Sequence, residues 1–500
     1  MIVMKSKISI FLLVVFSFLT LSCGEDYLDT APTASVDASA AFLTTKNAEA
    51  AVNGIIRTFY AQYGTYGSQG YGNHTALFHV WDTMGDDLVI PNTTNGWHLA
   101  DARWIGHRTD VNVSTAMPYR YYYRIIANTN MAIANIDNAA GLQADRDRLK
   151  GEVHLLRAYA YFLLVQMYGK RYVAGVNNDQ LGVPLVLTPT TEGQPRATVE
   201  EVYAQINADL DLAITLLPST PVNKSHADKE VAKGLKARVA LVQQNWALAE
   251  TMANEARQGV PLMTPAEYQS GFSNISMGEW MWGIDHLEDQ TAFFWGFHSY
   301  MSCNFNSSAI RVAPRLISSA LYNQIPATDV RKTMWAATAN DPNTIAPPGG
   351  VKPAYMTQKF RLDVAAPATS YMGDVPFMRA AEMYLIEAEA QARQGEDTNA
   401  QNTLFALVST RDPNYVTSTN TGAALIDEIL LQRRIELWGE GFRFFDLKRM
   451  NLPLNRNGSN HVSAVVGALF DVPAGDPRWE YLIPRAELDA NKALAGQQNP

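Results

Sequence analysis

The sequence predicts an all-α protein, in which a tetratricopeptide-like helical scaffold is joined to a loop-rich, irregular half. Three observations support this fold class. Apolar residues recur at helical spacing over long stretches, strand propensity is low throughout, and two helix pairs carry small residues where helices would cross. The first pair starts at Ala232 and the second at Ala380. Both resemble degenerate tetratricopeptide units of about 34 residues, although a generic helical bundle fits the pattern equally well.

Each expected helix follows from local spacing. Ala51, Ile55 and Phe59 are four apart and share one helix face, and Thr198 and Glu201 have the spacing of a capping box. The expected helices cover residues 47–63, 119–137, 146–168, 198–217, 229–257 (two helices broken near Asn245), 379–393, 398–409 and 423–439. Residues 64–115 and 261–370 are instead rich in Gly, Pro, Asn and aromatics, and long loops of this kind are usually functional.

The N-terminus predicts export and lipid anchoring. Lys5 and Lys7 precede an apolar run over residues 8–21 that is too short to span a bilayer but has the length of a signal-peptide core. The run ends in a small residue before Cys23, as lipidation requires, so residues 1–22 are predicted to be removed and Cys23 to be lipidated. Thr20 departs mildly from the preferred leucine. An ordinary secretory signal with an incidental cysteine is the alternative.

Composition and the absence of known motifs argue against several classes of protein. The net charge of −9 argues against nucleic acid, which calls for a basic face. With Cys23 lipidated, Cys303 has no partner in the chain, so no disulfide framework is expected. The nine histidines form no metal-binding pair, and neither a phosphate-binding glycine motif nor a GxSxG elbow is present. No cofactor, metal or catalytic residue is therefore predicted.

Several motifs, in order along the chain, carry a resemblance to a known family. They are CGEDYLD from Cys23, LRAYAYF from Leu156, GVPLV from Gly182, RAAEMYL from Arg379, and the stretch from Arg433 to Arg449 that holds RRIEL and GFRFFDLKR. Their order and spacing resemble the SusD/RagB family of outer-membrane nutrient-binding lipoproteins. The resemblance implies a SusD-like N-terminal region over 23–220 and a C-terminal region over 221–500. It also implies that the chain sits on a SusC-like TonB-dependent transporter in the outer membrane and helps load glycans or other large nutrients.

A glycan needs a flat aromatic face with polar groups beside it, because a sugar ring has an apolar C–H face and a rim of hydroxyls. In the resembling family, the loop after the first helix often supplies such a Trp, and Trp97 lies at that place. A structural role for Trp97 is equally open. The six candidate ligand-binding residues are Trp97, Trp104, Asp101, Asn95, Tyr71 and Trp295.

Other conspicuous residues are interpreted as structural. Trp280 and Trp282 are spaced for a strand and are expected in the core. Asp86 and Asp87 could hold calcium or act as acid and base, but adjacent acids more often cap the next segment. Arg434, Glu436, Arg443 and Asp446 invite a catalytic interpretation, yet ion pairs that lock the last long helix to the scaffold are favoured.

Three functions compete. The leading hypothesis is a non-catalytic, surface-exposed lipoprotein that binds oligo- or polysaccharide and delivers it to its transporter. An all-helical glycoside hydrolase is the second, and a transporter-associated scaffold or peptide binder is the third. The sequence does not name the ligand.

Overall fold

The structure is a computed structural model, and it describes residues 38–61, 70–286, 296–362 and 373–500. The predicted signal peptide, Cys23 and Trp295 lie outside the described residues. None of the described helices is long and apolar enough to cross a membrane.

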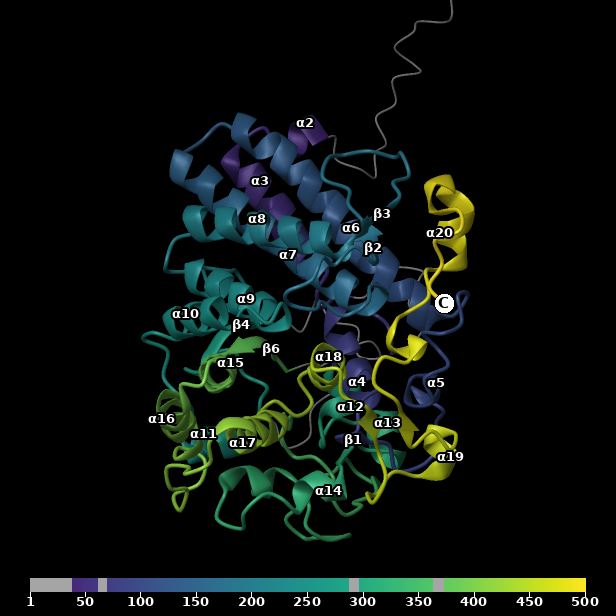
Figure 1. The fold of residues 1–500 in the computed structure, drawn as a ribbon, viewed down its shortest axis with the longest axis vertical. Helices are drawn as coiled ribbons and strands as arrows, with labels where there is room; N and C mark the ends of the chain where they lie inside the picture. Colours follow the sequence, from purple (N-terminus) through teal and green to yellow (C-terminus); the bar gives the residue numbers. More distant parts are fainter. Residues whose placement is uncertain (1–37, 62–69, 287–295, 363–372) are drawn as a thin grey trace, which may run out of the picture.

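The first group of helices forms a layered stack, seen at the upper left of Figure 1. Neighbours along the chain pack on each other from α6 onward, and α3 packs on α6 and α7. The members are α2 (Ala38–Ala41), α3 (Thr45–Arg57), α6 (Val113–Asn135), α7 (Gln143–Tyr168), α8 (Val199–Leu216), α9 (Lys229–Val242) and α10 (Trp246–Ala256). The predicted capping box of Thr198 and Glu201 opens α8. Asn245 caps α10, which confirms the predicted break.

The helical array continues after a long irregular segment. α15 (Ala380–Arg393) packs on α10 and on α16 (Asp397–Val408), and α17 (Gly422–Glu436) packs on both α15 and α16. Successive antiparallel helix pairs, each covering one face of the next, build the predicted helical scaffold. The all-α fold class is confirmed.

The second half is irregular and occupies the right and bottom of Figure 1. Its helices are short: α4 (His74–Thr83), α5 (Leu99–Ala102), α11 (Pro265–Ser270), α12 (His298–Met301), α13 (Ser308–Val312), α14 (Ser319–Tyr322), α18 (Arg443–Arg449), α19 (Ser463–Val466) and α20 (Arg485–Ala490). Among the described residues, the 3₁₀ segments Val330–Met334, Pro477–Trp479 and Lys492–Leu494 accompany them, and a further one, Ile136–Asn138, continues α6 of the stack. Helix α4 lies inside a stretch predicted to be loop. All ten of its side chains are buried, so it has no polar face and no amphipathic pattern.

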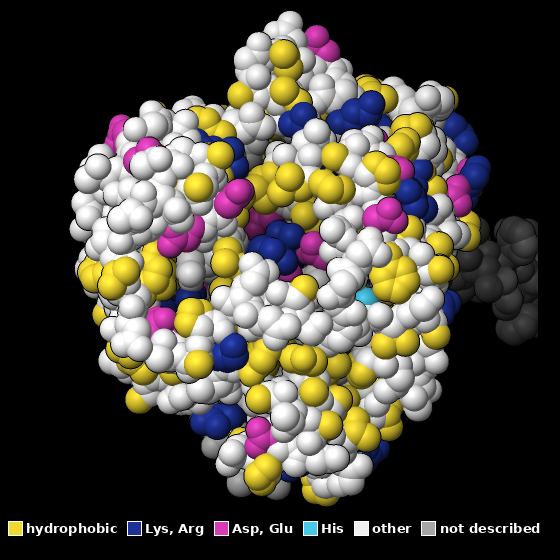
Figure 2. Space-filling view, turned by 60° about the horizontal axis from the view of Figure 1, so that its bottom comes forward, with side chains coloured by type: hydrophobic (Ala, Val, Ile, Leu, Met, Phe, Trp, Pro, Cys, Tyr) yellow, Lys and Arg dark blue, Asp and Glu magenta, His cyan; other side chains and the backbone are white. Residues whose placement is uncertain are grey.

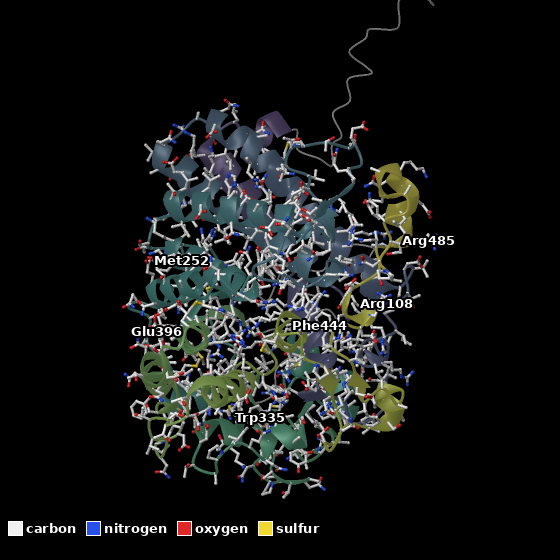
Figure 3. All side chains as sticks on the ribbon, in the orientation of Figure 1. Arg108, Met252, Trp335, Glu396, Phe444 and Arg485 are labelled. Carbon is white, nitrogen blue, oxygen red and sulfur yellow. The ribbon has the colours of Figure 1, made fainter. Side chains whose placement is uncertain are left out.

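The described strands form four short antiparallel pairs. They are β1 (Leu88–Val89) with β5 (Leu316–Ile317), β2 (Leu181–Pro184) with β3 (Arg196–Thr198), β4 (Trp280–Ile284) with β6 (Val375–Arg379), and β7 (Leu454–Asn455) with β8 (Asp471–Val472). Trp280 and Trp282 on β4 are buried, which confirms their predicted place in the core. Side chains fill the space between the two halves, where Phe444 of α18 lies near the middle of Figure 3.

Buried charges join the helical scaffold to the irregular half. Glu436 at the end of α17 contacts Arg331, Arg379 and Arg411 at 3.1 to 3.3 Å, and every one of these side chains is fully buried. Burial alone would raise the pKa of Glu436, but the guanidinium groups of Arg411, Arg379 and Arg331 hold it well below its usual range. Glu436 therefore has the structural role favoured from the sequence.

The neighbouring charges are paired as well. Arg443 donates to Asp86 at 2.6 Å, Arg434 donates to Asp87 at 2.6 Å, and Arg433 donates to Asp446 at 2.7 Å. The adjacent acids Asp86 and Asp87 are thus engaged by guanidinium groups, rather than capping the next segment.

Candidate functional site

Trp97 lies on the loop between β1 and α5, and backbone contacts hold this loop in place. Asn92 donates to the Val312 carbonyl at the end of α13, at 2.8 Å. The Asn95 side chain accepts a hydrogen bond from the Trp97 backbone N–H at 3.2 Å. The Trp97 ring itself is half-buried, so part of its surface remains available to a ligand.

A second aromatic residue supports that ring. Tyr300 of α12 meets Trp97 edge-to-face, with ring centroids 6.1 Å apart and an interplanar angle of 71°. On its other side Tyr300 stacks on His79 of α4 at 4.6 Å, and His98 stands perpendicular to it at 5.0 Å. Helices α4 and α12, which are far apart in the sequence, therefore meet the Trp97 loop, and their side chains fix the angle of the indole ring.

Asp101 and Tyr71 lie inside the protein rather than on display. Asp101 is 1% exposed and accepts hydrogen bonds from Ser114 at 2.9 Å, from the Tyr71 hydroxyl, and from His98 Nδ1 at 3.1 Å. Burial, and then the Asp101 charge, raises the pKa of the Tyr71 phenol well above its ordinary value. Asp101 and Tyr71 are thus bound to each other, and Asp101 positions His98. The expectation that either side chain faces a ligand is wrong for this structure.

Trp104 is likewise a core residue. It is 2% exposed, its Nε1 donates to the Met84 carbonyl at 2.8 Å, and its ring meets Trp479 edge-to-face at 4.6 Å. A ring packed on both sides has no face for a sugar, which contradicts the expected stacking role. Asn95 stays beside Trp97, and its buried Nδ2 has no hydrogen-bond partner in the described part of the chain.

Sequence reasoning missed Tyr300, His79 and Arg315. Arg315 precedes β5, and its guanidinium carbon lies 5.8 Å from the Tyr300 ring centroid. No local pattern marks these residues, because their proximity to Trp97 arises only from the packing of α4, α12 and β5 around the loop.

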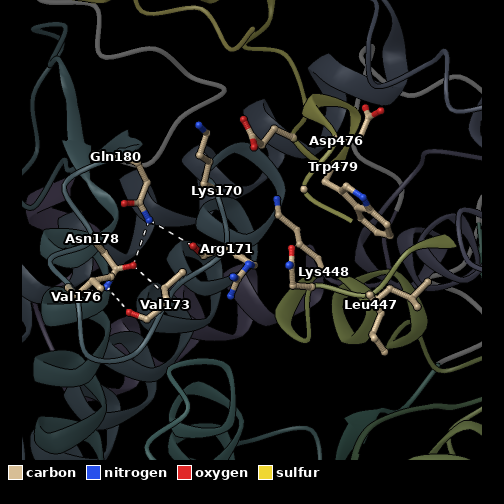
Figure 4. A pocket seen from close by; sticks show the side chains of 14 residues that line it. Lys170, Arg171, Val173, Val176, Asn178, Gln180, Leu447, Lys448, Asp476 and Trp479 are labelled. Atoms are coloured by element: carbon tan, nitrogen blue, oxygen red, sulfur yellow. Dashed lines mark hydrogen bonds between the residues drawn. The ribbon is translucent and has the colours of Figure 1, made fainter. Parts of the chain in front are cut away.

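Other hollows on the surface have a different character. A cleft of about 400 Å³ lies between the segment after α7 and the end of α18, and Figure 4 shows Lys170, Arg171, Lys448 and Asp476 at its walls. Its one aromatic residue, Trp479, is 4% exposed. On the face in Figure 2, basic and acidic side chains gather in a central hollow. The cleft beside Trp479 offers no exposed aromatic face of the kind that Trp97 provides.

Comparison with known proteins gives the class. Residues 26–241 match the family model described as starch-binding associating with outer membrane, and residues 295–500 match the SusD family model. The chain belongs to the SusD/RagB family.

Individual relatives are similar to this protein over most of its length. SusD-like protein P2 of Formosa agariphila is 25% identical, across 89% of this chain and 90% of that protein. A SusD-like protein of Bacteroides ovatus is 22% identical, across 89% and 82%. The solved structure of a SusD-like carbohydrate binding protein from Bacteroides vulgatus superposes with a TM-score of 0.78 at 27% identity, covering 90% of this chain and 97% of that one. A laminarin binding SusD-like protein, at 20% identity and a TM-score of 0.67, shares the fold.

Proposed function

We propose that this protein is a non-catalytic, surface-exposed lipoprotein that binds oligo- or polysaccharide and delivers it to a SusC-like TonB-dependent transporter in the outer membrane. The observation that carries the proposal is the half-buried Trp97 ring, held at a fixed angle on Tyr300 within a family that includes a carbohydrate-binding structure. A rigid indole suits the apolar face of a sugar, because little side-chain freedom is lost on binding.

The aspartates between residues 82 and 101 favour binding over hydrolysis. A glycosidase needs two carboxyl groups flanking the scissile bond. Asp101 is buried and accepts three hydrogen bonds, while Asp86 and Asp87 are neutralised by Arg443 and Arg434. Asp82 is 3% exposed, and burial raises its pKa to about 7, but its oxygens accept the backbone N–H groups of Gly441 and Arg443. None of these groups is free to meet a substrate.

Isothermal titration of the soluble mature chain against a panel of polysaccharides tests the function. We expect saturable binding of at least one polysaccharide, with no reducing sugar released on prolonged incubation. Released sugar would support the hydrolase instead. Capture of a transporter from detergent-solubilised outer membrane, without binding of any glycan in the panel, would support the scaffold.

Anchoring gives a prediction of its own. A lipoprotein cysteine carries several acyl chains, and more than one chain is needed for stable membrane attachment. We therefore expect Cys23→Ala to move the protein from the membrane fraction to the soluble fraction, with its affinity for the bound polysaccharide unchanged. Fractionation followed by titration measures both. A Cys303→Ala protein is the control, because this buried thiol is expected to leave fractionation unaltered.

A further inference from the structure

Arg315 is a fully buried arginine that uses little of its hydrogen-bonding capacity. Its side chain is 0% exposed, and Nη1 donates to the Ala313 carbonyl at 2.9 Å. Nε and Nη2 are buried and have no hydrogen-bond partner among the described residues. Unpaired buried donors on a charged group are costly, so native proteins rarely keep them without a purpose.

The other fully buried arginines have hydrogen-bond partners that Arg315 lacks. Arg331, Arg379 and Arg411 are equally buried and each faces carboxylates. Arg456 faces none, but it donates to the carbonyl oxygens of Gly85, Ala102 and Thr83 at 2.6 to 3.0 Å. Within the described ranges, Arg315 contacts no carboxylate and donates to one carbonyl oxygen only, that of Ala313.

The unpaired atoms form the edge with which arginine binds anions. Nε and Nη2 point the same way and match the two oxygens of a carboxylate or sulfate. This protein uses that edge repeatedly: Arg157 holds Asp209 with it at 2.8 and 2.6 Å, and Arg434 holds Asp87 with it at 3.0 and 2.6 Å. In Arg315 the same edge has no acidic partner in the described part of the chain.

Of the two histidines near Arg315, only His79 offers an N–H without a partner in the described part of the chain, and neither adds negative charge. Both ring nitrogens of His79 are buried without partners among the described residues, whereas His98 already donates its Nδ1 hydrogen to Asp101. Burial lowers the pKa of both histidines, so the rings are neutral near neutral pH; the one N–H of His98 points to Asp101, and that of His79 has no partner within the described ranges. Burial also lowers the pKa of Arg315 to about 10, which leaves the guanidinium charged near neutral pH. Asp101 is already occupied by Tyr71, Ser114 and His98.

We propose that the Nε/Nη2 edge of Arg315 binds an anionic substituent of the glycan, a uronic carboxylate or a sulfate ester, so that the protein selects acidic polysaccharides over neutral ones. The proposal rests on the proposed function, because Trp97 and Tyr300 connect Arg315 to the surface at which the sugar stacks. Since Arg315 is 0% exposed and its guanidinium carbon lies 5.8 Å from the Tyr300 ring centroid, binding of the anion includes a local displacement of the side chains that cover it.

Matched pairs of polysaccharides test this selectivity and separate the two sources of charge. The probes are polygalacturonate with its fully methyl-esterified form, fucoidan with its desulfated form, and neutral laminarin. We expect at least one acidic polymer to bind tenfold or more tightly than its neutral form, and Arg315→Met to abolish that preference. Binding of a neutral polymer that depends on Trp97 but not on Arg315 overturns this inference and leaves the proposed function intact. Binding of none of the polymers overturns the inference, whereas the proposed function falls only if its own broader panel also fails.

Thermal unfolding supplies an independent readout. Removing an unpaired buried charge should leave the melting temperature of Arg315→Met unchanged or raised, whereas Arg456→Met loses satisfied hydrogen bonds and should melt earlier. An equal loss in both variants contradicts the inference. So does a crystal structure of the complex in which ordered waters, rather than the ligand's anion, occupy Nε and Nη2 of Arg315.

Discussion

Glu436→Gln is expected to lower the free energy of unfolding by about 3–5 kcal/mol, the cost of breaking a buried ion pair on one side. Glu436 is 0% exposed, and its two oxygens are shared by Arg331, Arg379 and Arg411 at 3.1 to 3.3 Å. The glutamine keeps the shape but removes the charge. Arg379 then retains Glu279 and Glu440, Arg411 retains Glu279, and Arg331 retains Asp329. Denaturant unfolding of wild type and variant measures the difference.

The control lies on the same helix. Asp427 is exposed on α17, so Asp427→Asn should change the stability by less than about 0.5 kcal/mol. Equal stability of the Glu436→Gln protein and wild type would show that the charge network contributes nothing net.

Acid should reproduce the effect of the Glu436 substitution in the wild type. The arginines hold the pKa of Glu436 below its unfolded value, so the folded state favours the carboxylate. The stability that this group contributes is fully present above the unfolded pKa of about 4.3 and is lost as the pH falls toward the folded value. The difference in the free energy of unfolding between wild type and Glu436→Gln should therefore be constant near neutral pH and become smaller below about pH 4.

The sequence predicted the helical scaffold well because its helices are long and several of them have one apolar face. Ala51 and Ile55 of α3 share such a face, and Asn245 marks the break between α9 and α10 by its capping side chain. The same reasoning could not find α4, whose residues are buried on every side. Helix α4 is only ten residues long and half of its residues are polar, so neither length nor periodicity distinguishes it from the loops around it.

The candidate site was harder to predict because exposure is decided by contacts distant in sequence. Trp97 and Trp104 lie in one polar stretch and look alike. Only the fold shows that Trp104 reaches back to the Met84 carbonyl and packs on Trp479, while Trp97 stays half-buried against Tyr300. Family resemblance distinguished them by position, which the residue pattern alone could not do.

Trp97→Ala is expected to weaken polysaccharide binding by about tenfold to a hundredfold, which corresponds to about 1.4 to 2.7 kcal/mol. The loss includes the stacking face and the support that the ring gives to the side chains behind it. The fold should be little affected, because Trp97 is half-buried and its backbone is held by Asn95 rather than by the indole. Titration of wild type and variant against the polysaccharide found in the panel measures the change.

The chain contains its own control for a generic effect of losing a tryptophan. Trp246 of α10 is also half-buried, but it belongs to the helical scaffold rather than to the Trp97 loop. The Arg393 guanidinium lies 5.0 Å from its ring centroid. Trp246→Ala should keep wild-type affinity, whereas Tyr300→Phe should keep the edge-to-face support and bind within about threefold of wild type. An unchanged affinity in Trp97→Ala, with both controls also unchanged, would place the glycan elsewhere on the molecule. A loss confined to Trp97→Ala identifies this ring as the platform, because among the tryptophans that the structure describes it is the half-buried one that contacts a second aromatic ring.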